Sequence, residues 1–145
     1  KGGAAVNELL HMVYDLEPTT HGVDFRGAAE ALVLRQRRRS LVILMTHLLG
    51  EDIEDLLPAL RLLRRTPYVL VADLRQIEVD EALEGRPADL HEAFAAMGAW
   101  RSRLDRRQLH ERLRAEGVRI LDVSPTGLGP ALVSGYYDAK RGGGL

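Results

Sequence analysis

The stretch LVILMT, residues 41–46, decides the fold class of this chain. It is an unbroken apolar run rich in branched side chains, which is typical of a parallel strand covered on both faces. YVLVADL, residues 68–74, has the same character and predicts a second buried strand. VRILDV, residues 118–123, is less apolar and predicts a third strand that lies nearer an edge of the sheet.

Helical patterns separate these three strands. We expect a helix over 4–15, a second helix that Asp24 caps and that runs to about Arg38, a third over 51–65, a short helix before a break at 85–87, a long helix to Glu116 and a final helix to about Arg141. This alternation implies a parallel, Rossmann-like α/β sheet with helices on both faces. Because three strands are few for so many helices, we interpret residues 1–145 as a single domain whose other strands lie upstream in a longer protein.

The expected long helix carries several large apolar side chains. Phe94, Met97 and Trp100 keep helical spacing and are expected in the core, although Trp100 is the one that could anchor an interface. Gly117 suits the position that ends this helix.

Composition narrows the classes of protein. The formal net charge of −1 argues against a protein dominated by attraction to nucleic acid or to anionic membranes. The absence of cysteine excludes disulfides and thiolate metal sites. Residues 1–145 show neither the pattern of a signal peptide nor an apolar run near the ~20 residues that cross a bilayer.

Three segments, in this order, carry a resemblance to a known family. They are DFRGAAEALVLRQRRRSLVILMTHL from residue 24, LLPALRLLRRTPYVLVADLRQ from residue 56 and LRAEGVRILDVSPTGLGPALVSGYYDAKRGGGL from residue 113. The chain resembles the carboxyl-terminal half of domain-of-unknown-function family 58. Proteins of that family carry a von Willebrand factor A-like domain and are often associated with MoxR-type AAA+ ATPases. The resemblance implies a doubly wound, six-stranded sheet of which this chain holds the last three strands.

The resemblance also implies where a metal site would fall. In metal-binding A domains a divalent cation lies above the carboxyl ends of the central strands. The loop TTHGVD offers Thr19, Thr20 and Asp24 as ligands, and Thr46-His47 stands where the family pattern has Thr-Asp. No Asp-x-Ser-x-Ser loop occurs in the chain. The implied site is therefore a degenerate metal or ligand rim, and we expect no bound cation or other cofactor.

Asp73, at the end of the second strand, belongs to the same rim. His47 has three interpretations: a surface histidine at a strand end, a metal ligand that favours Zn²⁺ or Mn²⁺, or a general base. As a base it would form a hydrolytic triad with Asp73 and Ser124 along the edge where α/β folds bind ligands. Ser124 lacks a Gly-x-Ser-x-Gly elbow, and a helix cap is the simpler role for either partner. We favour the first interpretation and keep a hydrolase as the alternative.

The run RQRRR, residues 35–39, concentrates positive charge. Arg35, Arg37, Arg38 and Arg39 suit a helix end, where cations interact favourably with the helix dipole. They also suit an ion-pair surface for a protein partner, where arginine is enriched. A phosphate-binding patch for nucleic acid is a further alternative, but no aromatic side chain interleaves with the arginines, so no nucleic-acid partner is expected.

The resemblance implies a non-catalytic protein-interaction module that serves a MoxR-type AAA+ ATPase in assembling or remodelling a client complex. We expect it in the cytoplasm, or as the cytoplasmic part of a protein whose membrane anchor lies upstream. Because the first strand would have an unpaired edge, we expect the isolated chain to form oligomers. The client and the particular ATPase stay open.

Overall fold

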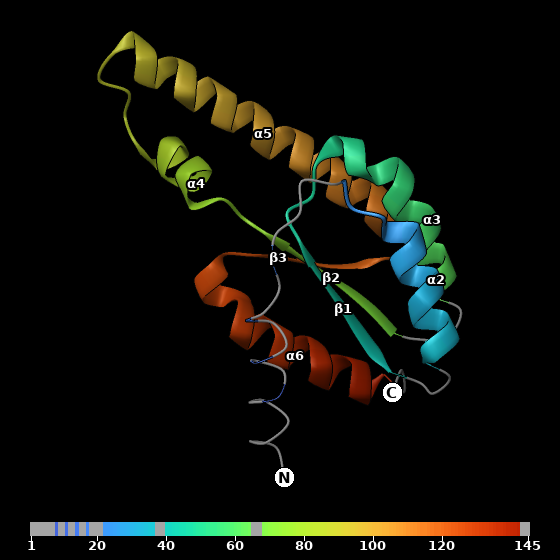
Figure 1. Ribbon diagram of the computed structural model, residues 1–145. Helices are drawn as coiled ribbons and strands as arrows, with labels where there is room; N and C mark the ends of the chain where they lie inside the picture. The colour runs from blue at the N-terminus through green and yellow to red at the C-terminus, as the bar shows by residue number, and fades with distance from the viewer. Residues whose placement is uncertain are drawn as a thin grey trace.

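A computed structural model describes residues 22–36, 40–64 and 68–142, together with positions 8, 11, 14 and 17 (Figure 1). The elements are α2 (Phe25–Arg35), β1 (Leu41–Thr46), η1 (Gly50–Asp52), α3 (Ile53–Leu63), β2 (Tyr68–Leu74), α4 (Ile77–Glu84), α5 (Leu90–Ala115), β3 (Arg119–Val123), η2 (Pro125–Gly127) and α6 (Leu128–Arg141). The helix expected over 4–15 lies mostly outside the described residues.

The three strands form one sheet in the order β1-β2-β3, and both neighbouring pairs are parallel. This confirms the predicted α/β fold and the edge position of the third strand. The register places Thr46 beside Asp73, and Asp73 beside Asp122. Three polar side chains therefore follow one another across the carboxyl edge of the sheet.

The strands differ in burial. Every residue of β2 from Val69 to Asp73 is buried, as expected of a central strand. β1 is covered less than its unbroken apolar sequence predicts, because it is the other outer strand of the described sheet. Its Met45 side chain is 57% exposed.

Helices pack on both faces of the sheet. On one face, α2, α3 and the last turns of α5 surround the main core. The buried members of that core are Phe25, Ala29, Leu48, Ile53, Leu56, Ala59, Leu60, Leu63, Val69, Val71, Leu109, Leu113 and Val118. On the other face, α6 contacts β2 and β3. A Cβ on Gly135 of α6 would lie 2.8 Å from Leu70 Cδ2, so the missing side chain allows the helix to approach the sheet closely.

Local signals set both ends of α5. The carboxylate of Asp89 accepts a hydrogen bond of 2.8 Å from the N–H of Glu92, which satisfies one donor of the first turn. Gly117 has a φ of 74°, and the N–H of Val118 donates to the carbonyl of Leu113 at 3.0 Å. This is the Schellman arrangement that glycine favours, and it confirms the predicted end of the helix.

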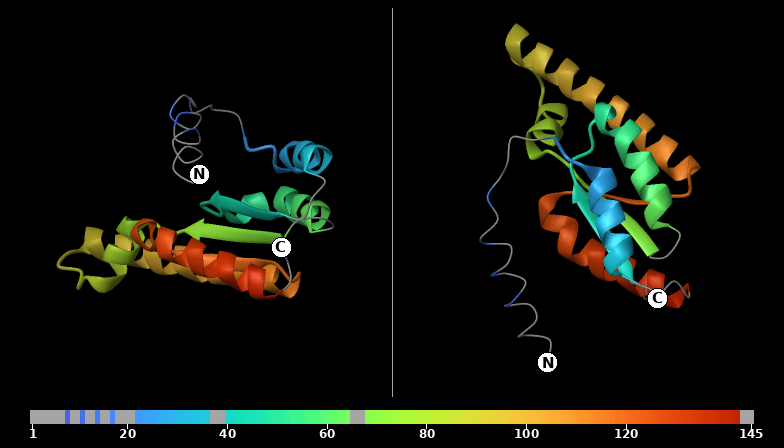
Figure 2. Two further views of the ribbon diagram at one scale, coloured as in Figure 1. Left: turned by 90° about the horizontal axis from the view of Figure 1, so that it is seen from below. Right: turned by 45° about the vertical axis from the view of Figure 1, so that its right-hand side comes forward.

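The amino-terminal half of α5 extends past the sheet and lies beside α4 (Figures 1 and 2). Phe94, Met97 and Trp100 are 62%, 67% and 63% exposed there. The prediction that these side chains belong to the core is wrong, because that half of the helix has no sheet beneath it. Leu109 and Leu113, further along the same helix, are buried.

Candidate functional site

Asp73 is the most enclosed polar residue at the carboxyl edge of the sheet, with no exposed surface. Its Oδ1 accepts a hydrogen bond of 2.9 Å from the N–H of Leu48. Its Oδ2 lies 2.9 Å from Arg106 Nη2 and 2.6 Å from His110 Nε2. A buried carboxylate requires such partners, so Asp73 ties the loop after β1 and the helix α5 to the central strand.

Arg106 completes this arrangement. Its guanidinium donates to the carbonyls of Leu74 at 3.0 Å and of Asp73 at 2.9 Å, and it reaches Asp122 Oδ1 at 3.1 Å. The planar fork of arginine donors allows one side chain to serve several acceptors. Its buried Nε has no hydrogen-bond partner among the described residues.

His110 and Arg106 were not predicted as site residues. They stand four positions apart on α5, in the stretch where the buried positions Leu109 and Leu113 also lie. The available signal was two polar residues at positions that share the spacing of core residues. The apolar positions after Leu104 do not continue the spacing of those before it. The sequence alone therefore does not show which polar positions of the helix face the core.

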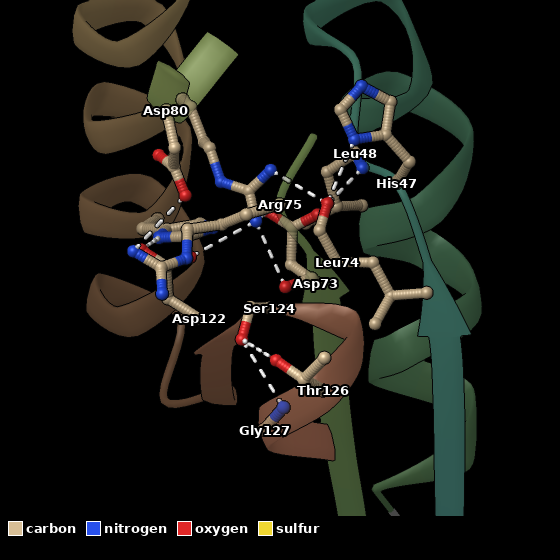
Figure 3. A network of polar contacts seen from close by, with 12 residues as sticks. His47, Leu48, Asp73, Leu74, Arg75, Asp80, Asp122, Ser124, Thr126 and Gly127 are labelled. Carbon is tan, nitrogen blue, oxygen red and sulfur yellow. Dashed lines mark hydrogen bonds and ion pairs between the residues drawn. The ribbon is translucent and has the colours of Figure 1, made fainter. Parts of the chain in front are cut away.

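His47 and Ser124 have local partners instead of each other. Nδ1 of His47 lies 3.0 Å from the carbonyl of Leu74, so Nδ1 is the donor in that bond (Figure 3). Ser124 Oγ accepts from the N–H of Gly127 at 3.2 Å and caps the turn before α6. The histidine in contact with Asp73 is His110. The described contacts therefore do not join the triad considered from the sequence.

The A-domain resemblance places the possible cation site at this edge, and the residues that the structure describes there do not fit a cation. The carboxylate of Asp73 already has a guanidinium nitrogen and an imidazole nitrogen at its Oδ2. The positive charge of Arg106 in direct contact would repel a cation. Among the described residues, no group of three or more His, Asp or Glu side chains could hold a metal ion.

The other predicted site residues have separate positions. Asp24 caps α2 by accepting from the N–H of Gly27 at 2.8 Å, as predicted. Thr46 ends β1 beside Asp73. Arg35 is exposed in the last turn of α2. Thr19, Thr20, Arg37, Arg38 and Arg39 lie outside the described residues.

A cavity of about 280 Å³ opens at the same edge, between the end of the sheet, α4 and α5. Two histidines and two aspartates, Asp80 and Asp122, contribute to its wall. Its arginines are Arg75, Arg103, Arg106, Arg107 and Arg114. With neutral histidines the wall carries three more positive than negative charges, so the cavity is basic although the chain as a whole is slightly acidic.

A second feature lies on the projecting half of α5. Five large apolar side chains follow one another at intervals of three or four residues, and each is at least 45% exposed. We refer to Leu90, Phe94, Met97, Trp100 and Leu104 as the apolar row. This spacing places them along one side of the helix.

A family model described as "Protein of unknown function DUF58" matches residues 1–106. The matched range includes β1 and β2 and ends within α5, so β3 and α6 lie beyond it. No curated protein and no solved structure matches the chain significantly. Each helix in the described ranges is too short or too polar to cross a lipid bilayer.

Proposed function

The chain belongs to the DUF58 family of proteins of unknown function, and we propose that it is a non-catalytic protein-interaction module. The resemblance to A-like domains associated with MoxR-type AAA+ ATPases suggests such an ATPase as the partner, in the assembly or remodelling of a client complex. That partnership would place the domain in the cytoplasm, or on the cytoplasmic side of a membrane. The observation that carries the proposal is the apolar row on α5.

The apolar row has the composition of an interface centre. Contiguous exposed apolar side chains are unfavourable in water and commonly indicate a contact surface for another protein. Aromatic residues, methionine and arginine are the types enriched at such surfaces. Trp100 and Leu104 line a shallow cavity of about 200 Å³ together with Arg103 and Arg107.

This arrangement indicates the chemistry of the partner surface. The apolar row offers a continuous apolar surface, and Trp100 is its largest side chain. Two exposed arginines, Arg103 and Arg107, border the apolar row at Trp100. The partner that fits is an apolar groove or helix face bordered by acidic side chains, in which large apolar anchors contribute most of the binding energy.

The partner interaction is best tested with a MoxR-type ATPase from the same organism. We expect the double variant Met97→Ala/Trp100→Ala to bind the ATPase at least about tenfold more weakly, because each anchor contributes more than about 1 kcal/mol. Calorimetry with the purified proteins, with and without ATP, measures this. Val133→Ala/Tyr137→Ala, which truncates two exposed apolar side chains of α6, is the matched control. Undetectable binding of the wild type, or equal weakening by both double variants, would contradict the proposal.

Arg35 provides a separate test of the predicted basic partner surface. Charge reversal in Arg35→Glu should slow association with the ATPase, because exposed charges act mainly by steering the encounter. The effect should disappear in high salt. An unchanged association rate at low salt would remove Arg35 from the partner surface.

We also propose that further strands of an A-like domain pair with β1. In the described sheet β1 has a neighbour on one side, and Met45 lies exposed on it. An unpaired strand edge offers backbone donors and acceptors to another chain. The isolated chain should therefore form oligomers by light scattering, and a dilute monomer would contradict this part of the proposal.

A further inference from the structure

The basic cavity at the carboxyl edge of the sheet shares Arg103 and Arg107 with the border of the apolar row, but the proposed function does not use the cavity itself. We propose that it binds a small phosphate-bearing anion of the size of phosphate or diphosphate. The proposal rests on three observations: an excess of positive charge, two lining arginines without an ion pair among the described residues, and a volume that suits a small ligand.

The positive charge is compensated only in part: Asp80 lies 3.6 Å from Arg75, and Asp73 lies 2.9 Å from Arg106. Asp122 is shared, because Arg106 lies 3.1 Å and Arg75 3.8 Å from its Oδ1. Arg103 and Arg114 have no ion pair within the described part of the chain. Their charges therefore converge on a space that holds too few carboxylates to neutralise them.

Arg107 adds a positive charge whose ion-pair partner lies outside the cavity wall. Its carboxylate partner, Glu111, is 3.2 Å away on the exposed side of α5 and is not part of the cavity wall. An anion in the cavity would interact with Arg103, Arg107 and Arg114 without first breaking a buried ion pair. These arginines are exposed, so they can reorient at little cost.

The inner wall adds a guanidinium group that its hydrogen bonds to the carbonyls of Asp73 and Leu74 hold in place. The Arg106 side chain is only 14% exposed, and its Nε has no partner among the described residues. Fixed arginine forks match the oxygens of a phosphate group well, and low solvent exposure strengthens each contact.

The size of the cavity limits the ligand. Pockets for drug-sized ligands usually span about 300 to 1,000 Å³, and this one measures about 280 Å³. It therefore suits phosphate or diphosphate better than a complete nucleotide. Its position also agrees with the rule that open parallel sheets bind ligands beyond the carboxyl ends of their strands.

Isothermal calorimetry with sodium diphosphate and sodium phosphate, at constant ionic strength set with sodium chloride, tests the proposal. The wild type should bind diphosphate with measurable heat and should melt at a higher temperature in its presence. The double variant Arg103→Gln/Arg114→Gln should bind at least tenfold more weakly. The matched control is Arg101→Gln/Arg112→Gln, which removes two positive charges from the same helix outside the cavity. The control should keep its affinity within twofold.

The results separate the possibilities. No binding by the wild type at millimolar diphosphate overturns the proposal, and so does equal weakening of both double variants, since that would indicate general charge attraction. If the cavity variant is unfolded by circular dichroism, chemical-shift changes in the wild type decide instead. Shifts at the amides of Gln76, Ser102 and Asp122 support the cavity, whereas shifts confined to other regions contradict it. ATPase binding is a separate measurement, so failure here leaves the proposed function to its own test.

Discussion

The two halves of α5 have similar side chains in opposite environments. Leu109 and Leu113 in the second half are 5% and 0% exposed, whereas Leu90 in the first half is 73% exposed. The second half lies over the sheet and is tied to it through Asp73, while the first half extends past the sheet beside α4. The comparison teaches that apolar spacing identifies a helix and one side of it, but not whether anything covers that side.

Among the variants that test this contrast, Asp73→Ala should have the largest effect on stability. Removing the carboxylate leaves Arg106 without its buried charge partner, His110 Nε2 without its acceptor and the N–H of Leu48 without an acceptor. We expect the free energy of unfolding in urea to fall by about 3–5 kcal/mol. Asp105→Ala, which removes an exposed ion pair with Arg101, should cost about 0.5 kcal/mol or less. Similar losses for both variants would mean that Asp73 does not anchor α5.

Two leucine truncations compare the halves directly. Leu113→Ala should lower the free energy of unfolding by about 2–5 kcal/mol, because it opens a cavity in a fully buried site. Leu90→Ala, at the exposed start of the helix, should change it by about 0.5 kcal/mol or less. Denaturation monitored by circular dichroism gives both values. A large cost at Leu90 would show that the apolar row is covered in solution, for example by a second copy of the chain.

Two glycines of the same helix region should respond in opposite directions. Gly117→Ala should destabilise the protein by about 1–2 kcal/mol, because an alanine at a φ of 74° is strained. Gly98→Ala should stabilise α5 by up to about 1 kcal/mol, because alanine favours the helix and an added Cβ would meet no atom within 4 Å. Thermal melting of the two variants measures these shifts. A destabilising Gly98→Ala would indicate that a partner surface approaches α5 there.

The smallest expected effect concerns the contact of α3 with the residue that follows α5. A hydrogen bond from Arg61 lowers the pKa of the Glu116 carboxyl from its ordinary value of 4.5, and the positive charges of Arg61 and Arg64 add to this effect. Because the folded-state pKa is depressed, the stabilisation is present above the ordinary pKa and is lost as the pH falls through the folded-state value.

The stability difference between wild type and Glu116→Gln should therefore be small near neutral pH and should vanish in acid. Chemical-shift titration of the Glu116 carboxyl gives its pKa directly. The depression should shrink in high salt, since exposed ion pairs are screened. A Glu116 pKa at or above 4.5 would contradict the Arg61 contact.

Much of the fold could be predicted from local patterns. The strands over 41–46 and 68–74 have the bounds that their apolar runs predict, and Asp24 and Gly117 set helix ends as expected. These features depend on neighbouring residues: an apolar run between polar loops, a carboxylate beside unpaired N–H groups, or a glycine where φ is positive.

The candidate site could be predicted only in part. The carboxyl edge and its members Thr46, His47 and Asp73 follow from strand ends in a parallel sheet, since all such ends meet at one edge. The partners of Asp73 could not be predicted in this way, because Arg106 and His110 stand more than thirty positions further along the chain. Their approach depends on the angle at which α5 crosses the sheet.

The sequence by itself therefore determined the fold class, the strands and the helix ends, because each arises from the physics of a few consecutive residues. Only the tertiary structure decided which half of α5 is buried, which histidine contacts Asp73 and where the arginines gather. These features depend on where a 26-residue helix leaves a three-stranded sheet. Burial and electrostatic contacts are properties of surfaces brought together from distant parts of the chain.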